Sequence, residues 1–333
     1  MVKKRSLIIR HAALGDVIMA TAVIPYLQQD GYDIDFYTNK AGREIIKHDP
    51  RIKRIIIHDE SVPVEKLCAL WQKVGEPYDK VVNLHDLIEN RVLFAYPQPE
   101  YFIPVRKRRQ IVGNENYIDM HIERAGYKPK TGMRVPSLCL SKEEKMKGKA
   151  WARKHKRYFK VVWGLAGSSV HKIWRYFEPC AREFLRRHKD AYIFTVGDYA
   201  CKLLTFPHER VENTMFWEMP FRDTMILAKY ADLVIGPETG VIQAAGAFGT
   251  PVLCLLTHSS KYQVTGTFKN DYSIQAPIWC SPCHLLHKFT YIWRHVCQVG
   301  TNPDLPRCCE HGMGDVLDKM EEAYGLWKSG KAA

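Results

Sequence analysis

The first residues with chemical potential are Gly15 and Asp16, which follow a short apolar stretch near the N-terminus. Gly15 permits a tight turn, and Asp16 falls near the start of the helical pattern that comes next. A carboxylate in this place can satisfy the free N–H groups of a helix start and suit its dipole. It can also take a proton from the hydroxyl group of an acceptor molecule. The position of Asp16 therefore supports two interpretations, a helix cap and a catalytic base.

A loop in the C-terminal half has the composition of an anion-binding loop. Its sequence is Gly164-Leu-Ala-Gly-Ser-Ser-Val-His-Lys-Ile-Trp174. Gly167 and Ser168 let backbone N–H groups approach an anion, and Lys172 adds a positive charge. The alternative is an ordinary loop between a strand and a helix that carries a surface lysine.

A second loop, Gly236-Pro-Glu-Thr-Gly240, precedes a helix of very small residues. Thr239 and Gly240 lie where the N–H groups of that helix point outward, which suits a phosphate group. Ala244, Ala245 and Gly246 allow the helix to pack closely on a sheet. Close packing alone does not account for Glu238, Thr239 and Gly240 occurring together, so we predict a phosphate-binding site here.

Five of the ten cysteines are concentrated near the C-terminus, in the segment 280–311. In a cytoplasmic chain, clustered cysteines favour a metal over disulfides. A Cys-x-x-Cys pair followed by further cysteines favours a closed structural zinc site, with iron as an alternative metal. A set of reduced structural thiols is the other interpretation. The predicted ligands are Cys280, Cys283, Cys297 and Cys308, with Cys309 as a substitute.

The composition sets the broad class of the protein. The chain has 333 residues, of which 46% are hydrophobic and 26% charged, and this excludes disorder as its main state. No apolar run approaches the roughly 20 residues of a membrane span. Only three apolar residues follow the basic start before Arg10, which is too short for a secretory signal. We expect a cytoplasmic protein.

The net charge of +13 favours an anionic partner, such as nucleic acid, anionic lipid or a phosphorylated sugar, with plain solubility as the alternative. Basic residues cluster at 3–5, at 142–160 and in the run Arg106-Lys-Arg-Arg109, which follows Tyr101 and Phe102. Basic residues beside aromatic ones suit a phosphorylated lipid sugar, a membrane surface or a nucleic acid strand. A solvated surface loop is the alternative for the 106–109 run.

The elements that must position these residues alternate between strands and helices. Short apolar runs at 6–10, 34–37, 54–57 and 78–84 are separated by helical patterns, and a second alternation starts at 159. This order predicts an α/β fold with two doubly wound parallel sheets. We expect an N-terminal domain at 1–140, a charged and solvated linker helix at 141–158, and a C-terminal domain at 159–333 that includes the cysteine finger. Ligands of such folds bind beyond the carboxyl ends of the strands, in a cleft between the domains.

The loops, taken in order, resemble the motifs of glycosyltransferase family 9, the heptosyltransferase family with the GT-B fold. The resemblance covers nearly the whole chain. The matching stretches are Arg10-His-Ala-Ala-Leu-Gly-Asp-Val-Ile-Met-Ala-Thr, Gly167-Ser-Ser-Val-His-Lys-Ile-Trp, Gly236-Pro-Glu-Thr-Gly and Ala247-Phe-Gly-Thr-Pro-Val. The resemblance implies two Rossmann-like domains, with the acceptor on the first and an ADP-activated sugar on the second. Some family members also carry a C-terminal cysteine finger, including ones that contain iron.

The resemblance also implies roles for individual residues. Asp16 would be the general base for the acceptor hydroxyl in a reaction that inverts the anomeric carbon, and Lys172 would balance charge on the leaving diphosphate. Thr239 and Gly240 would donate N–H groups to phosphate. The implied nucleotide-sugar site consists of Gly15, Gly167, Ser168, Glu238, Thr239, Gly240 and Gln243.

Two departures from the family pattern bear on the substrate. The family usually has Asp at the position of Glu238 and His at the position of Gln243. The donor or the acceptor can therefore differ from those of lipopolysaccharide heptosyltransferases. The expected acceptor is lipopolysaccharide core or another anionic surface glycan, which would bring the protein to the inner face of the membrane. Two alternatives stay open: sugar transfer to a modified base of phage DNA, and a non-catalytic nucleic-acid-binding protein built on this fold.

Overall fold

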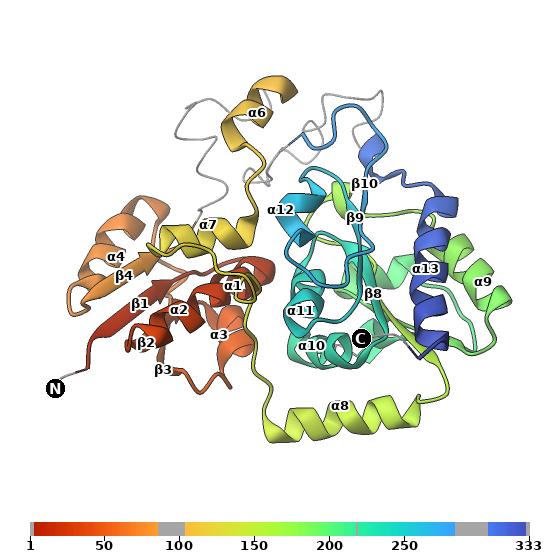
Figure 1. Cartoon of the computed structure of the whole chain (residues 1–333), viewed down its shortest axis with the longest axis horizontal. Helices are drawn as coiled ribbons and strands as arrows, with labels where there is room; N and C mark the ends of the chain where they lie inside the picture. Colours follow the sequence, from red (N-terminus) through yellow and green to blue (C-terminus); the bar gives the residue numbers. More distant parts are fainter. Residues whose placement is uncertain (1–2, 86–103, 218, 284–305, 331–333) are drawn as a thin grey trace. The chain divides into compact units, whose positions relative to one another are not determined.

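The computed structural model describes residues 3–85, 104–217, 219–283 and 306–330, and these form two compact units (Figure 1). The first unit contains the described residues up to 85 together with 117–142. The second contains 104–116 and the described residues from 143 onward. The segment 104–116 thus belongs to the second unit, whereas a simple division of the sequence at residue 140 would assign it to the first.

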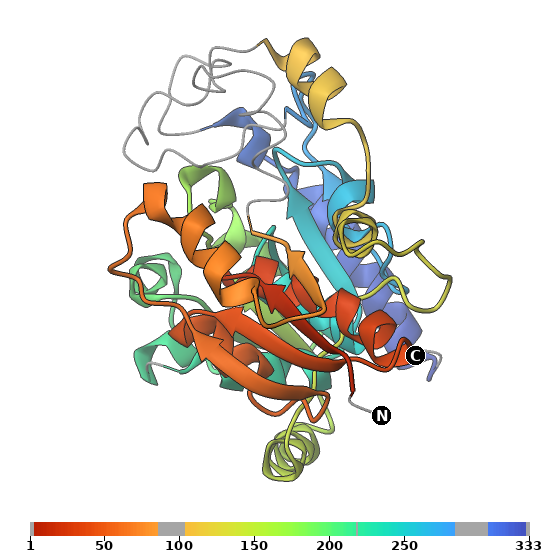
Figure 2. The same cartoon turned by 90° about the vertical axis from the view of Figure 1, so that its left-hand side faces the viewer.

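The first unit is built on a parallel four-stranded sheet in the order β3-β2-β1-β4. The red and orange strands of this sheet lie side by side in Figure 2. Helices follow the strands, as in a doubly wound fold. The strands are β1 (Arg5–Ile9), β2 (Asp33–Thr38), β3 (Ile52–Ile57) and β4 (Lys80–Asn83), and the helices are α1 (Leu14–Ala20), α2 (Ile24–Gln29), α3 (Lys40–Ile46), α4 (Leu67–Gly75) and α7 (Tyr117–Arg124).

The second unit is built on a parallel six-stranded sheet in the order β10-β9-β8-β5-β6-β7. Read from β7, this is the 3-2-1-4-5-6 order of the Rossmann fold. The strands are β5 (Phe159–Gly164), β6 (Ala191–Val196), β7 (Val211–Asn213), β8 (Leu233–Pro237), β9 (Val252–Leu256) and β10 (Ile274–Gln275). Its helices are α6 (Val105–Val112), α8 (Lys142–Lys154), α9 (Phe177–Arg187), α10 (Phe221–Tyr230), α11 (Gly240–Phe248), α12 (Lys261–Thr265) and α13 (Met313–Lys328).

Helices cover both faces of the second sheet, which explains why β5 is buried along its whole length. Phe159, Val161 and Trp163 of β5 belong to the apolar core formed with α9 and α13 (Figure 1). Helix α11 covers the other face. Gly246 of this helix faces the ring of Phe268, which follows α12, and a Cβ atom at this glycine would lie 2.3 Å from that ring. Packing therefore requires a glycine at 246, although its tight neighbour is Phe268 rather than the sheet that the sequence indicated.

The predicted linker helix is packed against the second unit as α8. Gly148 is buried, and a Cβ atom there would lie 2.2 Å from the Tyr230 ring of α10. The Glu144 carboxylate accepts two hydrogen bonds, of 2.6 and 2.7 Å, from the guanidinium of Arg222. A paired and largely buried charge of this kind holds the helix in place. The expected solvated linker is thus a packed helix, although its other face is charged and exposed.

Sheet topology determines where a ligand can bind in each unit. The strand order reverses between β1 and β4 in the first unit and between β5 and β8 in the second. Ligands of open parallel sheets bind at the carboxyl ends of the strands at this switch point. The loops after β1, β5 and β8 carry the three motifs found in the sequence. Among the helices that the structure describes, none is long and apolar enough to cross a membrane.

Candidate functional site

Asp16 lies inside helix α1, at the carboxyl edge of the first sheet. The helix begins at Leu14 and has Ala13 at its N-cap position, so Asp16 is not the cap residue. Its carboxylate forms an ion pair with the guanidinium of Arg10, whose side chain is 3% exposed. Arg10 also donates a 3.2 Å hydrogen bond to the carbonyl of Leu84 after β4. Asp16 keeps 17% of its side chain exposed, so a fixed carboxylate remains accessible at this edge.

Three stacked histidines, which the sequence analysis missed, lie at the same edge. The ring centroids of His11 and His58 are 4.0 Å apart, and those of His11 and His85 are 3.9 Å apart. The Tyr37 hydroxyl and Nδ1 of His58 are hydrogen-bonded at 2.8 Å. One signal could have revealed the stack, because each histidine comes within two residues of the end of a strand: β1, β3 or β4.

His121 of α7 is a further buried imidazole of the first unit. Its Nδ1 lies 2.6 Å from the carbonyl oxygen of Tyr117. Burial lowers the pKa of His121 to about 4, and the nearby charge of Arg10 acts in the same direction. Asp16 opposes this shift. His121 is therefore a neutral group next to the Arg10–Asp16 ion pair at neutral pH.

Gly167, Lys172 and Thr239 meet at the carboxyl edge of the second sheet. A Cβ atom at Gly167 would lie 2.6 Å from Cδ of Lys172 and 2.9 Å from Cγ2 of Thr239. Glycine is therefore required where the β5 loop passes the start of α11. The predicted lysine and the predicted phosphate-binding turn, 67 residues apart in sequence, lie together as their positions after β5 and β8 imply.

Two hydroxyl groups at this edge are buried without hydrogen-bond partners among the described residues. They are Oγ1 of Thr239 and Oγ of Ser169. Helix α11 begins at Gly240, directly after Thr239, and no side chain caps its first N–H groups. Buried polar groups are normally paired, so donors left open at a helix start indicate a place for an anion. Ser169 was not predicted; the predicted Ser168 is exposed.

The Glu238 carboxylate is buried between the ends of β8 and β9. Its Oε1 atom accepts hydrogen bonds from the N–H groups of Thr257 at 2.9 Å and Ser259 at 3.4 Å. Its Oε2 atom lies 3.1 Å from Nδ1 of His258. Burial raises the pKa of Glu238, while the positive charge of Lys172 lowers it. The extra methylene of Glu238, compared with aspartate, thus reaches partners on the neighbouring strand end.

Gln243 connects the predicted phosphate helix to α12. Its side chain is buried in α11, and Nε2 donates a 3.4 Å hydrogen bond to the carbonyl of Val264. Helix α12 is fixed in turn by the capping box of Ser260 and Gln263. Gln243 therefore has a structural contact in addition to its predicted place in the donor site.

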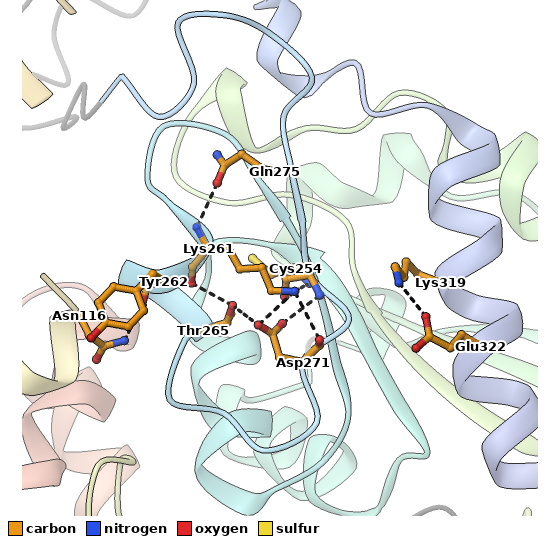
Figure 3. Close-up of polar contacts among 10 residues, drawn as sticks. Asn116, Cys254, Lys261, Tyr262, Thr265, Asp271, Gln275, Lys319 and Glu322 are labelled. Atoms are coloured by element: carbon orange, nitrogen blue, oxygen red, sulfur yellow. Dashed lines mark hydrogen bonds and ion pairs between the residues drawn. The ribbon is translucent and has the colours of Figure 1, made fainter. Parts of the chain in front are cut away.

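Segment 104–116 is attached to the second unit by hydrogen bonds. Arg109 of α6 donates to the carbonyls of Pro282 at 2.7 Å and Trp279 at 2.9 Å. The Asn116 amide donates to the carbonyl of Tyr262 at 2.6 Å, as Figure 3 shows beside the contacts that fix α12. One residue of the basic run is thus used to hold a loop, while Arg106 and Lys107 are exposed.

The described cysteines do not form a metal site by themselves. Cys280 and Cys308 are buried and Cys283 is partly buried, whereas Cys297 lies outside the described residues. Within the described part of the chain, no group of three or more His, Cys, Asp or Glu side chains is arranged to hold a metal ion. The donor set present does not fit a metal without Cys297, and the metal finger stays a prediction.

Comparison with known proteins places the fold. No protein-family model and no curated protein sequence matches the chain. Solved structures do match, with 97% of this chain covered by a glycosyltransferase of family 9 from Veillonella parvula (98% of that chain, TM-score 0.67, 13% identity). The ADP-heptose lipopolysaccharide heptosyltransferase II of E. coli matches over 97% of this chain and 99% of its own, with a TM-score of 0.65 and 14% identity. The E. coli heptosyltransferase WaaC with ADP covers 82% of this chain and 93% of its own, with a TM-score of 0.55 and 16% identity.

The matches to solved structures show the fold of this chain. The chain has two Rossmann-like α/β units, as predicted, and its fold is that of the GT-B glycosyltransferases. More particularly, it is the fold seen in these solved heptosyltransferases and in the family 9 glycosyltransferase.

Proposed function

We propose that this chain is an inverting glycosyltransferase. It would move a heptose-like sugar from a nucleotide-diphosphate donor, an ADP-sugar, to a hydroxyl group of an anionic acceptor such as lipopolysaccharide core or another surface glycan. The observation that carries the proposal is the set of open donors at the start of α11, next to Lys172 and Gly167. The family 9 fold supports it, since heptosyltransferases of this fold include one solved with ADP.

On this proposal the second unit holds the donor. The N–H groups of Thr239 and Gly240 and the two open hydroxyls would bind the diphosphate, and Lys172 would neutralise the charge that develops as the sugar bond breaks. Donors fixed in advance stabilise a leaving group without having to reorganise during the reaction. Ser169 takes the place of Ser168 in this set because its side chain is the buried one.

The first unit would supply the base. Inversion requires an acceptor oxygen to attack the sugar carbon opposite the leaving diphosphate, with its proton taken by a base. The Asp16 carboxylate is suited to this role because Arg10 keeps it in one place and part of it is exposed. Gly15 precedes it at the second position of α1.

A thermal-shift screen of nucleotides and nucleotide sugars tests the donor. The true donor should raise the melting temperature, by an amount set by its concentration relative to its Kd. ADP and ADP-sugars should act more strongly than UDP and UDP-sugars. If no nucleotide or nucleotide sugar raises the melting temperature, the proposal is wrong.

The positive charge of the chain is the basis for the proposed acceptor and location. The exposed Arg106 and Lys107 and the net charge of +13 favour an anionic glycan or glycolipid, and such an acceptor would place this protein at the inner face of the membrane. Transfer assays with lipopolysaccharide core and with base-modified DNA separate the main acceptor from its alternative. Strong, salt-sensitive DNA binding without nucleotide binding would instead indicate a non-catalytic protein.

The structural metal of the 280–311 segment is a separate proposal. It requires Cys297 to join the described cysteines Cys280, Cys283 and Cys308. Elemental analysis of protein purified without chelators should find zinc or iron at close to one atom per chain, and Cys297→Ser should abolish the metal content. Protein without either metal would contradict the finger and leave the transferase proposal intact.

A further inference from the structure

Helix α8 has one side that packs on the second unit and one side that faces solvent. The packed side contacts α10 through Glu144 and β6 through Trp151. At about 3.6 residues per turn, residues nine apart lie on opposite sides of a helix. Arg153 is therefore opposite Glu144. Lys149 and Lys145 precede Arg153 at spacings of four, which places all three cations on the solvent side.

This solvent side carries positive charge that the protein does not neutralise. We call it the outer face of α8, and it consists of the exposed residues Lys145, Met146, Lys149 and Arg153. Among the residues that the structure describes, no carboxylate forms an ion pair with any of these three cations. Lys147, which points to the flank of the helix, is instead paired with Asp223 of α10 at 2.7 Å. The unpaired charges are thus confined to the outer face.

Helix α9 of the same unit shows the contrast. It is also rich in exposed arginines, but Arg182 is paired with Glu178 and Arg186 with Glu183, both at 2.8 Å. Pairs at this spacing neutralise charge along the helix itself. The outer face of α8 has no such pairs in the described part of the chain, so it keeps a local excess of positive charge. Such an excess attracts an anionic partner.

Met146 indicates which kind of anionic partner fits. Its side chain is 62% exposed, and it precedes Lys149 by three residues, so the two side chains are neighbours on the helix. An apolar side chain beside cations is typical of helices that lie in a membrane interface, where it enters the boundary between headgroups and acyl chains. The outer face contains no aromatic ring on which the base of a nucleic acid could stack. These features favour lipid over nucleic acid.

We propose that the outer face of α8 is a docking surface for an anionic lipid bilayer, on which the helix lies without crossing it. Lys145, Lys149 and Arg153 would contact lipid phosphate groups, and Met146 would enter the headgroup region. The surface lies outside the proposed nucleotide-sugar site and does not depend on sugar transfer. It would keep the chain at a membrane, where a glycolipid acceptor is found.

Co-sedimentation of the full chain with lipid vesicles tests the inference. The wild type should sediment with vesicles of equal parts phosphatidylcholine and phosphatidylglycerol, and it should stay in solution with phosphatidylcholine alone. Added sodium chloride should release it, because salt screens exposed charges. Failure to bind the anionic vesicles at low salt overturns the inference.

Two variants of equal net charge separate this face from the overall charge of the chain. The α8 variant combines Lys145→Gln, Lys149→Gln and Arg153→Gln, and the control variant combines Arg182→Gln, Arg186→Gln and Lys189→Gln. All six side chains are exposed, so both variants should fold. The α8 variant should bind anionic vesicles about 100-fold more weakly, at roughly fivefold per charge, and the control should lose at most about threefold. Equal losses in the two variants overturn the inference, as does an α8 variant that binds like the wild type.

Met146→Gln separates a membrane from a nucleic acid. It leaves the charge of α8 unchanged, and it should weaken binding to anionic vesicles by about fivefold because apolar surface no longer enters the interface. A wild type that binds duplex DNA but not vesicles, with Met146→Gln binding DNA equally well, would instead assign the outer face to nucleic acid and overturn the membrane inference. The vesicle assay contains no nucleotide. A chain that binds vesicles but no nucleotide therefore contradicts only the proposed function, and the converse contradicts only this inference.

Discussion

The two sheet edges of this protein present different chemical groups. At the edge of the first unit, Arg10 is paired with Asp16 and the Tyr37 hydroxyl with His58. At the edge of the second unit, Lys172 lies beside Gly167 and Thr239. The buried hydroxyls of Thr239 and Ser169 have no partner among the described residues, which is also true of Thr38 at the first edge. A carboxylate fixed by a guanidinium suits the base proposed for the first edge, whereas a lysine beside open hydroxyl donors suits the phosphate groups proposed for the second.

The difference implies a division of labour. If the first edge provides a preformed base, changes there should reduce turnover and leave nucleotide binding unaltered. If the second edge provides open donors, changes there should weaken nucleotide binding. Variants in one unit that affect the property assigned to the other would contradict the division.

Removing the charge of Asp16 should have the largest effect. Asp16→Asn keeps the shape of the side chain and an oxygen for Arg10, but it cannot take a proton, so kcat should fall by about 10²- to 10⁴-fold. The Kd for ADP should not change. Sugar transfer is measured by release of the nucleoside diphosphate, and binding by calorimetry. Asp119→Asn, in the Arg134 ion pair of the same unit, is the matched control and should retain activity. Full activity of Asp16→Asn would exclude it as the base.

Acid should destabilise the first unit through His121. Its pKa is about 4 in the folded state and 6.5 as a free side chain, so the unfolded chain binds more protons between these values. The free energy of unfolding is therefore highest above pH 6.5, where His121 is neutral in both states, and it decreases as the pH falls toward 4. Between pH 7 and pH 5 it amounts to roughly 2 kcal/mol. Urea unfolding at both pH values measures it, and His121→Gln should show a shallower pH dependence. An equal dependence in this variant would contradict the assignment.

Adding a methyl group at Gly167, at the carboxyl edge of the second sheet, should weaken ADP binding by a smaller free energy than the change expected from His121. Gly167→Ala places a Cβ atom 2.6 Å from the Lys172 side chain, which must shift, and we expect about tenfold weaker ADP binding, or roughly 1.4 kcal/mol. Gly164→Ala is the matched control, because its Cβ atom would lie 3.4 Å from Val241. Calorimetry on both variants decides, and equal affinities would show that Lys172 does not need its observed position.

The sequence predicted the elements that carry periodic apolar patterns. The strands β1 to β4 lie within a few residues of the apolar runs at 6–10, 34–37, 54–57 and 78–84, and β5 starts at 159 as expected. Their signal is local, since apolar spacing follows from the side of the element that is buried. The short edge strands β7 and β10 were not predicted, because two or three residues are too few for a pattern.

The sequence indicated parts of the candidate site only where the local backbone requires a particular residue type. Glycine at 167 and the turn at 239–240 could be read from sequence because close approach and a helix start require particular residues. The inward side chain of Ser169, rather than Ser168, depends on the path of the loop after β5. The histidine stack joins residues from three strand ends far apart in the chain, so only the strand order brings them together.

The smallest predicted effect concerns Arg109, which lies in the basic run 106–109. Arg109 donates to the Trp279 and Pro282 carbonyls, which makes α6 part of the second unit although it follows the strands of the first in sequence. Arg109→Lys keeps the charge but loses the forked geometry that reaches both carbonyls. The loss should be at most about 1 kcal/mol and local.

Hydrogen exchange can detect so small a change. In Arg109→Lys, the backbone amides of 276–283 should exchange faster, whereas the Kd for ADP and the amides of β1 to β4 should stay as in the wild type. Arg106→Lys, at an exposed position of the same helix, should leave the exchange of 276–283 unaltered. If the first unit responds to Arg109→Lys and 276–283 does not, α6 acts with the unit that precedes it in sequence. The basic run 106–109 would then belong to the first unit, which contains Asp16, rather than to the second unit, which contains Thr239.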